Sequence, residues 1–469
     1  MTNKTYYDFA NPYVLRKEYP FGEEFTETFS GMSRDELHHI QNERFASALD
    51  QAAKVPFYKN LWKKHGVSRG DVRGLEDIKL LPTFGKAEIM ESVAAMPPLG
   101  LHSVIEDPDS KAHYPIILHT TSGTTGEPQP LIYSPRTREV QSLLLARAYH
   151  QFGIGSNDVV QSFYGFGPIN GGHYIREAFT KYNPAIFLPT GTGVETPTEK
   201  QIEYMKRFGT TVLTGFGDYV ARVGRYARSN NEGLAKDINI RMLVGHFGFD
   251  SYDVLRELWG SEVEIFDWYG VGDTGIVGWE GKEHNGLHIM EDAQYVEIEA
   301  ESEEQDDKGS GNIVVTCLYI NDVFPIIRFN THDVSCVLPP DNIDGYPFRR
   351  LGGIGGRSDD MVKFKGINIY PQSIGNIIEK TDDYAGNYLC EWVRLDDGKQ
   401  DLIIYIESSL KDSDGVRENY EAILKKSLGV TPRVRLVAKH GLDDLTGINV
   451  RQKPRRLIKS SKPALGAPL

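Results

Sequence analysis

The sequence predicts an α/β protein with a large N-terminal domain of mixed and parallel sheets with helices, and a small, mobile α+β C-terminal domain. Three observations support this prediction: the chain length, an alternation of apolar runs and helical stretches, and a glycine-rich segment near residue 352. A chain of 469 residues is too long for one ordinary core and suits two or three domains. Its 24 Tyr and 21 Phe, within 40% hydrophobic residues, support well-filled interiors.

Short β-branched and aromatic runs alternate with longer helical stretches from about residue 114 to residue 300. The expected strands include 159–164, 185–188, 211–213 and 240–244, and the expected helices include 198–208 and 219–228. Such alternation is typical of a parallel sheet, in which ligands bind beyond the carboxyl ends of the strands. An earlier helical pattern runs from Arg34 towards residue 64, and Pro56 is expected to end it.

The C-terminal part begins after a glycine-rich connection. Four of the five residues 352–356 are glycine, which predicts a flexible link. Before it, 312–318 and 323–329 are expected to form a β-hairpin; after it, strands at 402–406 and 433–438 flank a helix at 415–428. We therefore predict an N-terminal domain of residues 1–356, a hinge at 357–360 and a C-terminal domain at 361–469.

Composition excludes several classes of protein. A net charge of −13 argues against a general nucleic-acid binder, which needs excess Lys and Arg. No run approaches the length of a membrane span, and no signal peptide is evident at the N-terminus. The three cysteines, without CxxC spacing, suit a reducing compartment. We expect a cytoplasmic protein that binds neither nucleic acid nor a membrane.

One loop is rich in hydroxyls and glycines. Residues 120–126 read Thr-Thr-Ser-Gly-Thr-Thr-Gly and follow an apolar run at 114–118. Without bulky side chains, the backbone amides of such a loop can converge with hydroxyls on an anion, and a polyphosphate is the natural ligand. The loop lacks the Gly-Lys-Ser/Thr ending of the P-loop, and a plain surface linker is the alternative.

The loop resembles the phosphate-binding motif of the adenylate-forming superfamily, which includes acyl- and aryl-CoA synthetases. Other motifs of this family follow in order: Trp268–Thr274, Arg328–Asp333 and Gly356–Gly366. Further segments resemble the phenylacetate–CoA ligase branch. These segments are Asn368–Pro371, Gly286–Ile289, Pro325–Arg328 and Val55–Tyr58. The resemblance extends over nearly the whole chain, and the ordered set is more specific than any single motif.

The resemblance implies a site for ATP and the adenylate. Its expected residues are Thr121, Ser122, Gly123, Thr124, Thr125, Gly126, Gly248, Phe249, Tyr269, Gly270, Asp333 and Arg357. Tyr269 is expected to stack on adenine and Asp333 to accept hydrogen bonds from the ribose hydroxyls. Asp273 is expected to hold Mg²⁺ against the phosphates, since Mg²⁺ prefers carboxylate, water and phosphate oxygens. A glutamate is usual at this position of the family.

The resemblance also implies a moving catalytic lysine. Lys453 stands at the family's lysine position and is expected to bridge the acid and ATP, while Lys459 and Lys462 remain rivals. Asp359 is expected to be the pivot of the hinge. The sequence departs from the family at Gln452, Pro454 and His332, which puts the role of position 332 in doubt.

The acid substrate is expected to lie among aromatic residues and glycines. The expected acid-binding residues are Tyr164, Phe166, Gly167, Gly172, His173, Phe216 and Phe247. A flat ring could slide between such side chains and the backbone, although ordinary core packing is the alternative for each aromatic residue. Some relatives carry a cysteine-rich metal knuckle near position 284, but 279–284 and 344–346 contain no cysteine, so no zinc is expected.

Together these expectations describe an ATP- and Mg²⁺-dependent carboxylic acid:CoA ligase (AMP-forming), acting on an aromatic or arylalkyl acid. Its partners would be the small-molecule acid, ATP and CoA, and the branch often forms homodimers. The first alternative is an adenylating enzyme whose acceptor is an amine or a carrier-protein thiol. The second is a non-catalytic binding protein that retains the nucleotide fold.

Overall fold

The structure is a computed structural model. It describes residues 5–103, 115–121, 127–229, 238–248, 251–300, 309–320, 322–340, 345–365, 367–394, 400–449, 453–461 and 463–465. The chain forms two compact units, which we describe separately. The first comprises residues 1–160, 165–189 and 266–353, and the second comprises 161–164, 190–265 and 354–469.

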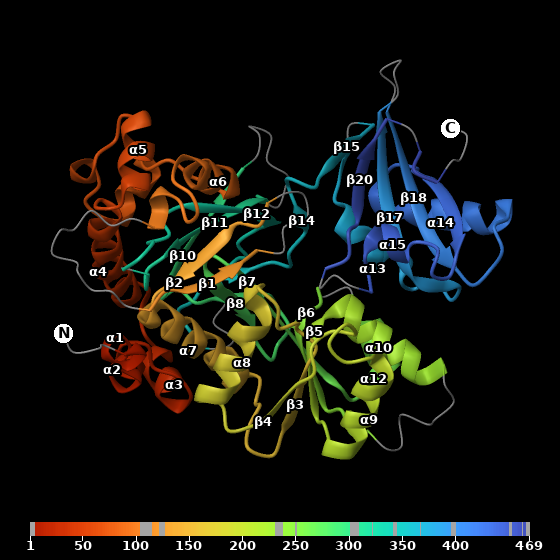
Figure 1. The fold of residues 1–469 in the computed structure, drawn as a ribbon, viewed down its shortest axis with the longest axis horizontal. Helices are drawn as coiled ribbons and strands as arrows, with labels where there is room; N and C mark the ends of the chain where they lie inside the picture. Colours follow the sequence, from red (N-terminus) through yellow and green to blue (C-terminus); the bar gives the residue numbers. More distant parts are fainter. Residues whose placement is uncertain are drawn as a thin grey trace. The chain divides into compact units, whose positions relative to one another are not determined.

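The first unit begins with helices and continues with antiparallel strands (Figure 1). Its helices are α1 (Tyr6–Phe9), α2 (Pro12–Glu18), α3 (Glu23–Phe29), α4 (Arg34–Ala52), α5 (Pro56–Lys64), α6 (Lys86–Ala95), α7 (Pro135–Gln151) and α8 (Asn170–Tyr182), with 3₁₀ turns η1 (Arg69–Asp71), η2 (Leu75–Leu80) and η3 (Leu101–Ser103). The predicted helix from Arg34 is two helices, because α4 ends at Ala52 and Pro56 begins α5 as its first residue.

The strands of the first unit belong to more than one sheet. The strands are β1 (Ile117–Thr120), β2 (Pro130–Tyr133), β4 (Ile186–Pro189), β8 (Gly275–Glu280), β9 (Leu287–Ile289), β10 (Gln294–Glu299), β11 (Gly311–Cys317), β12 (Phe329–Ser335) and β13 (Arg350–Leu351), with parts of β3 (Val159–Ser162) and β7 (Glu264–Val271). Strands β1 and β2 form an antiparallel pair, β13-β9-β8-β7 are antiparallel neighbours, and β11 pairs antiparallel with both β10 and β12.

Of the two strands predicted for the hairpin after residue 311, the first is confirmed and the second is wrong. Strand β11 forms as expected, but its partner is β12 at 329–335, and residues 323–328 form no strand. Pro325 has no amide hydrogen to donate to a sheet, and Arg328 has a φ of 60°, which an extended strand does not allow. These two residues delay the strand and place Asp333 within it.

In the second unit, β5 (Val212–Phe216) and β6 (Met242–His246) are parallel and in register, with Phe216 opposite His246. Helices α9 (Thr198–Phe208), α10 (Gly217–Ser229) and α12 (Tyr252–Trp259) lie beside these strands (Figure 1). A core that includes Leu213, Val220 and Leu255 joins the strands to the helices. The α/β alternation predicted from the sequence is therefore present.

The C-terminal residues of the second unit form an α+β layer. Its elements are β14 (Gly356–Arg357), β15 (Val362–Phe364), β16 (Ile367–Ile369), η5 (Pro371–Ser373), α13 (Ile374–Ile378), β17 (Tyr384–Arg394), β18 (Gln400–Ser408), α14 (Asp414–Leu428), β19 (Arg433–Ala438), α15 (Asp443–Thr446) and β20 (Leu457–Ser460). The sheet has the order β19-β18-β17-β20, and Tyr420 and Leu424 of α14 pack into its core. The predicted domain boundaries and the hinge at 357–360 stay predictions.

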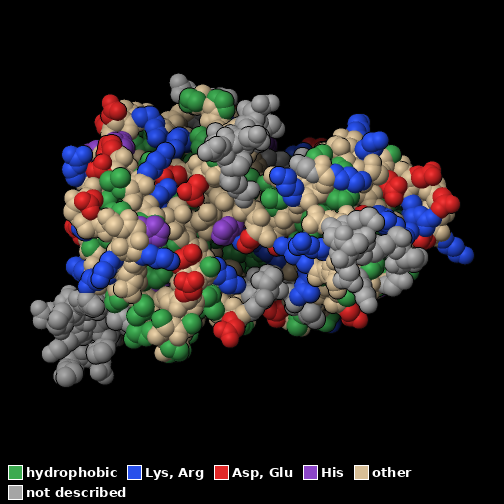
Figure 2. All heavy atoms as spheres, turned by 90° about the horizontal axis from the view of Figure 1, so that it is seen from above, with side chains coloured by type: hydrophobic (Ala, Val, Ile, Leu, Met, Phe, Trp, Pro, Cys, Tyr) green, Lys and Arg blue, Asp and Glu red, His purple; other side chains and the backbone are tan. Residues whose placement is uncertain are grey.

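The surface is that of a mixed-charge protein. On the face seen in Figure 2, acidic and basic side chains are interspersed and hydrophobic ones are scattered among them. In the described part of the chain, no helix is both long and apolar enough to cross a bilayer.

Candidate active site

The phosphate loop predicted at 120–126 begins where strand β1 ends. The amide of Thr121 donates to the carbonyl of Gln129 over 3.1 Å, and the Gln129 amide donates to Thr121 Oγ1 over 3.3 Å. These two bonds close the base of the loop against β2. The predicted residues Ser122, Gly123, Thr124, Thr125 and Gly126 lie outside the described residues, so their roles stay predictions.

The base of this loop is tied to the predicted magnesium residue. Gln129 donates its Nε2 proton to Asp273 Oδ1 over 2.6 Å, and Asp273 lies in the turn between β7 and β8. Burial raises the pKa of Asp273 to about 6, while the Gln129 bond and the charge of Lys86 lower it. A small cavity of about 20 Å³, room for about one water, is lined by Gln129, Asp273 and His102.

Tyr269 and Asp333 also meet in the first unit. The Tyr269 hydroxyl donates to Asp333 Oδ2 over 2.7 Å and lies 3.1 Å from Thr331 Oγ1, and all three residues are buried. The next residue, Gly270, leaves no room for a side chain, since a Cβ would lie 2.5 Å from the Gly275 carbonyl oxygen. The predicted adenine and ribose residues are therefore hydrogen-bonded partners.

A ring cluster lies at the carboxyl ends of β5 and β6 in the second unit. The Tyr164 hydroxyl lies 2.7 Å from His246 Nδ1 and donates to the Gly215 carbonyl over 3.1 Å. The Phe216 ring is 4.9 Å from that of Tyr164 and 5.1 Å from that of His246. The carboxyl edge of a parallel sheet is the usual place for a ligand in such folds.

Lys453 lies against this ring cluster. Its ammonium group is 5.1 Å from the centre of the Phe216 ring, within the range of a cation–π contact. Burial, and to a smaller extent the charge of Lys453, lower the pKa of His246 to about 3. His246 is therefore neutral at physiological pH. Of the rival lysines, Lys459 is exposed on β20, and Lys462 lies outside the described residues.

The remaining acid-binding predictions divide between the two units. In the first unit, His173 Nε2 lies 3.0 Å from the Phe166 carbonyl and 2.9 Å from that of Gly167, and its ring stacks on His119 at 4.9 Å. Gly172 is buried within α8. In the second unit, Phe247 is buried in the hydrophobic core, the packing role that the sequence left open.

The predicted adenine-wall and hinge residues also have defined places. Gly248 has a φ of 73° and accepts a hydrogen bond of 2.9 Å from the Ser251 hydroxyl, while Phe249 lies outside the described residues. Arg357 pairs with Asp359 through two hydrogen bonds, of 2.9 and 2.7 Å. Arg357, predicted to bind ATP, and Asp359, predicted to be the pivot of the hinge, thus form an ion pair.

Two functional candidates in the structure, Gln129 and His246, are not predicted from the sequence. Gln129 stands at the end of the phosphate loop, and His246 ends a strand that was expected to stop at residue 244. A polar residue at the carboxyl end of a parallel strand is a usable signal, because ligands gather at that edge. The partner of Gln129 is Asp273, 144 positions away, and the sequence gives no signal that the two residues meet.

Comparison with known proteins shows what this chain is similar to. Residues 366–457 match the family described as AMP-binding enzyme C-terminal domain. The chain is 26% identical over 435 residues to a phenylacetate-coenzyme A ligase of Aromatoleum evansii, which covers 88% of this chain and 93% of the relative. It is 28% identical over 368 residues to one of Pseudomonas putida, covering 76% of this chain and 78% of the relative.

The predicted resemblance to the adenylate-forming superfamily, in its phenylacetate–CoA ligase branch, is confirmed. Solved structures share the fold. A 2-hydroxyisobutyryl-CoA ligase in the postadenylation state has a TM-score of 0.80 at 21% identity, covering 93% of this chain and 92% of that chain. An anthranilate CoA ligase in complex with anthranoyl-AMP has a TM-score of 0.51 at 15% identity, covering 69% of this chain and 63% of that chain.

Asp273 is the residue predicted to hold a metal ion. Among the described residues, no three His, Cys, Asp or Glu side chains lie close enough to hold a metal ion together. Mg²⁺ is commonly bound by one or two carboxylates together with substrate phosphates. Asp273, beside the base of the predicted phosphate loop, fits that mode of binding.

Proposed function

We propose that this protein is an ATP-dependent carboxylate–CoA ligase (AMP-forming) for an aromatic or arylalkyl acid. The chain resembles phenylacetate–CoA ligases, which are AMP-forming acid–thiol ligases. One structural observation carries the proposal: the Gln129–Asp273 hydrogen bond of 2.6 Å joins the base of the predicted phosphate loop to the predicted magnesium residue.

In the first half-reaction, a carboxylate oxygen of the acid attacks the α-phosphorus of ATP. The oxygen–phosphorus bond of the adenylate forms, and the bond from that phosphorus to pyrophosphate breaks. We assign the phosphates to the loop at 121–126, the ribose hydroxyls to Asp333 and the adenine to Tyr269. Asp273 would hold Mg²⁺, which when bound supplies positive charge against the phosphates.

Lys453 is proposed to bridge the acid carboxylate and ATP in this step. Its position 5.1 Å from the Phe216 ring supports the assignment, because Phe216 ends a parallel strand where substrates commonly bind. A lysine suits the role, since its charge sits at the end of a flexible stem and can arrive and leave. The neutral His246 would not compete with Lys453 for the carboxylate.

The ring cluster of Tyr164, Phe216 and His246 supports an aromatic acid. Aromatic rings attract other rings at offset or edge-on geometry, and the Tyr164 and Phe216 rings already meet edge-on at 66°. Phe166 and His173 of the first unit remain proposed acid-binding residues, as do Gly167, Gly172 and Phe247.

In the second half-reaction, the thiol sulfur of CoA attacks the acyl carbonyl carbon of the adenylate. The carbon–sulfur bond forms, AMP leaves with the former carboxylate oxygen, and the thiol proton is lost to solvent or base. We propose that residues around Asp359 rearrange between the two steps, so that one site stabilises two transition states. A cytoplasmic location and a homodimer remain part of the proposal.

The test is acid-dependent exchange of pyrophosphate into ATP, run over benzoates, phenylacetates, indole acids and aliphatic acids. The proposal expects exchange with at least one aromatic or arylalkyl acid and little with aliphatic acids. Exchange confined to aliphatic acids would contradict the substrate class. CoA, pantetheine and amines are then compared as acceptors, and the proposal expects CoA to be the best acceptor.

A further inference from the structure

One face of helix α10 carries three charged residues at the spacing of helical neighbours. Asp218, Arg222 and Arg225 are separated by four and three positions, so they share a side of the helix. Each contacts residues beyond position 378 of the same unit. We call these three residues the α10 face.

The first contact of the α10 face is made by Asp218. Its Oδ2 accepts a hydrogen bond of 2.6 Å from Arg456, whose side chain is only 6% exposed. The same guanidinium donates to Asn387 Oδ1 and to the Tyr388 carbonyl, both over 2.8 Å. Arg456 is therefore held to β17 on one side and, through the half-exposed Asp218, to α10 on the other.

The second contact is made by Arg225. It donates to Glu379 Oε1 over 2.8 Å, and its guanidinium lies 5.7 Å from the Tyr384 ring. Gly386 leaves room for this arginine, because a Cβ there would lie 3.2 Å from the Arg225 Nη1 atom. Burial raises the pKa of Glu379 although Arg225 opposes the shift. Glu379 is therefore a buried carboxylate that depends on its partner.

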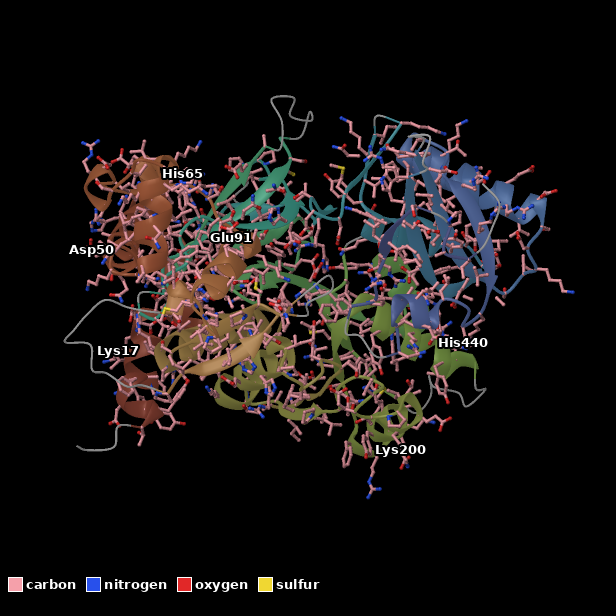
Figure 3. The ribbon with its side chains drawn as sticks, turned by 45° about the horizontal axis from the view of Figure 1, so that its top comes forward. Lys17, Asp50, His65, Glu91, Lys200 and His440 are labelled. Carbon is pink, nitrogen blue, oxygen red and sulfur yellow. The ribbon has the colours of Figure 1, made fainter. Side chains whose placement is uncertain are left out.

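The third contact is made by Arg222, which donates to the Ile448 carbonyl over 3.2 Å and also to the side chain of Asn449. The Arg222–Asn449 bond is exposed, whereas the other two contacts each include a buried or mostly buried partner, since Arg456 is 6% and Glu379 is 15% exposed. Ordinary surface pairs of the same unit are more exposed. Lys200, paired with Glu203, and His440, paired with Asp443, lie at the surface in Figure 3 and are at least half exposed. Exposed pairs of that kind contribute little to stability.

The Asp218–Arg456 ion pair is close in sequence to the contact between Phe216 and Lys453. Phe216 stands two residues before Asp218, and Lys453 stands three residues before Arg456. The Lys453–Phe216 contact and the Arg456–Asp218 ion pair therefore lie beside each other, each between the same two segments. Fixing Arg456 restricts where the ammonium group of Lys453 can go.

We propose that the α10 face consists of positioning residues that hold Lys453 at the ring cluster for adenylation and release it for thioester formation. This inference rests on the proposed two-step ligase function. No residue of the α10 face is assigned to touch substrate. Its effect is therefore expected in the half-reaction that needs Lys453, and not in the other.

The two half-reactions of an Arg225→Gln variant test the inference. Adenylation, measured as acid-dependent ATP–pyrophosphate exchange, is expected to fall about tenfold in maximal rate, because Glu379 loses its partner. The KM for the acid is expected to change little. Thioester formation from preformed acyl-adenylate and CoA is expected to stay near the wild-type rate.

The matched control is Arg228→Gln, on the same helix. Arg228 is exposed and donates to the Leu258 carbonyl rather than to the C-terminal residues, so both half-reactions should be unchanged. The double variant Arg225→Glu with Glu379→Arg should recover most of the adenylation rate. Equal loss in both half-reactions, or an unchanged adenylation rate, would overturn the inference.

A cross-link tests the same contact without catalysis. With Arg222→Cys and Asn449→Cys in one chain, a short bis-maleimide should join the two positions, and single-cysteine chains are the control for the three native cysteines. Adding Arg225→Glu should lower the yield. A yield that Arg225→Glu leaves unchanged would overturn the inference. Wild-type protein without any exchange activity would instead refute the proposed function, and the cross-link would still test the contact.

Discussion

Gln129 donates a hydrogen bond of 2.6 Å to the carboxylate of Asp273, 144 positions further along the chain. The bond connects the end of the predicted phosphate loop with the turn that follows strand β7. The same turn is fixed a second time, since the Tyr133 hydroxyl donates to the Gly272 carbonyl over 2.6 Å. Asp273 is thus held beside the base of the loop that is proposed to bind the triphosphate.

Asp273→Asn should raise stability and abolish adenylation. The raised pKa of Asp273 means that its ionised form is disfavoured in the folded protein, so its contribution to stability is largest at low pH and is lost as the pH rises to about 6. At pH 8, in the presence of a chelator, the variant should gain about 1–2 kcal/mol in free energy of unfolding. Thermal unfolding and pyrophosphate exchange measure the two effects.

The matching variant is Gln129→Leu, which should act in the opposite direction on stability. Removing the donor leaves the Asp273 carboxylate without this hydrogen bond, which should lower the free energy of unfolding by about 1–3 kcal/mol.

The outcome that would contradict the Asp273→Asn prediction is a variant less stable than the wild type at pH 8. The assigned cost of the buried charge would then be wrong.

Tyr269→Phe should weaken ATP binding while keeping the ring. The hydroxyl that bonds Asp333 over 2.7 Å is lost, and a hydrogen bond to a charged group contributes about 1.5–3 kcal/mol. We expect the KM for ATP to rise about tenfold. Tyr405→Phe is the control, because the Tyr405 hydroxyl donates a hydrogen bond of 2.7 Å to Glu391. This variant should lose stability without a change in the KM for ATP. An equal KM in both variants would remove Tyr269 and Asp333 from the nucleotide site.

The sequence predicted regular elements well where local signals were strong. Helix α9 and strand β19 have the predicted bounds, since each carries a clear period and a glycine or proline beside it. The strand at 323–329 failed because the left-handed φ of Arg328 depends on long-range contacts, such as its hydrogen bonds to Glu297. No local pattern reports such contacts.

The candidate site was predicted less completely. Motif order predicts Asp273 and Lys453 as site residues, and both roles stay predictions. It does not point to Gln129 or His246, whose partners come from distant segments of the chain. Tyr164 and His246 are 82 positions apart and meet only because β3 and β6 flank β5. Side-chain partnerships across strands therefore required the fold.

The stability of the first unit should fall as the pH drops from about 6.5 to 4. His102 is buried between Phe57 and Phe324, and burial lowers its pKa to about 4. A histidine whose pKa is lowered by folding costs stability below its unfolded pKa, here about 2–3 kcal/mol by pH 4. Thermal unfolding between pH 4 and 8 measures this loss.

The control for this prediction is His102→Phe. The phenyl ring keeps the aromatic contacts, and the Ser92 hydroxyl still accepts a hydrogen bond of 3.2 Å from the backbone amide of residue 102. The stability of the His102→Phe variant should depend less on pH between 4 and 8 than that of the wild type. If the variant and the wild type lost stability in parallel, His102 would not be the titrating group.

Lys453→Ala should separate the two half-reactions. Without its ammonium group, the transition state of adenylation loses charge stabilisation, and the rate should fall at least about 100-fold. Thioester formation from preformed acyl-adenylate should stay within about twofold, and Lys459→Ala, on the exposed side of β20, should leave both steps unchanged. Equal loss of both steps in Lys453→Ala would reject this lysine as the adenylation residue.

The proposed adenylation step is measured most directly by ATP–pyrophosphate exchange with the wild-type chain, one aromatic or arylalkyl acid and Mg²⁺, in the absence of CoA. We expect exchange that requires both the acid and Mg²⁺. Addition of CoA should then convert the acid to its thioester with release of AMP. Exchange that is absent with every acid tested, or release of ADP and phosphate instead of AMP and pyrophosphate, would contradict the proposed AMP-forming ligase function.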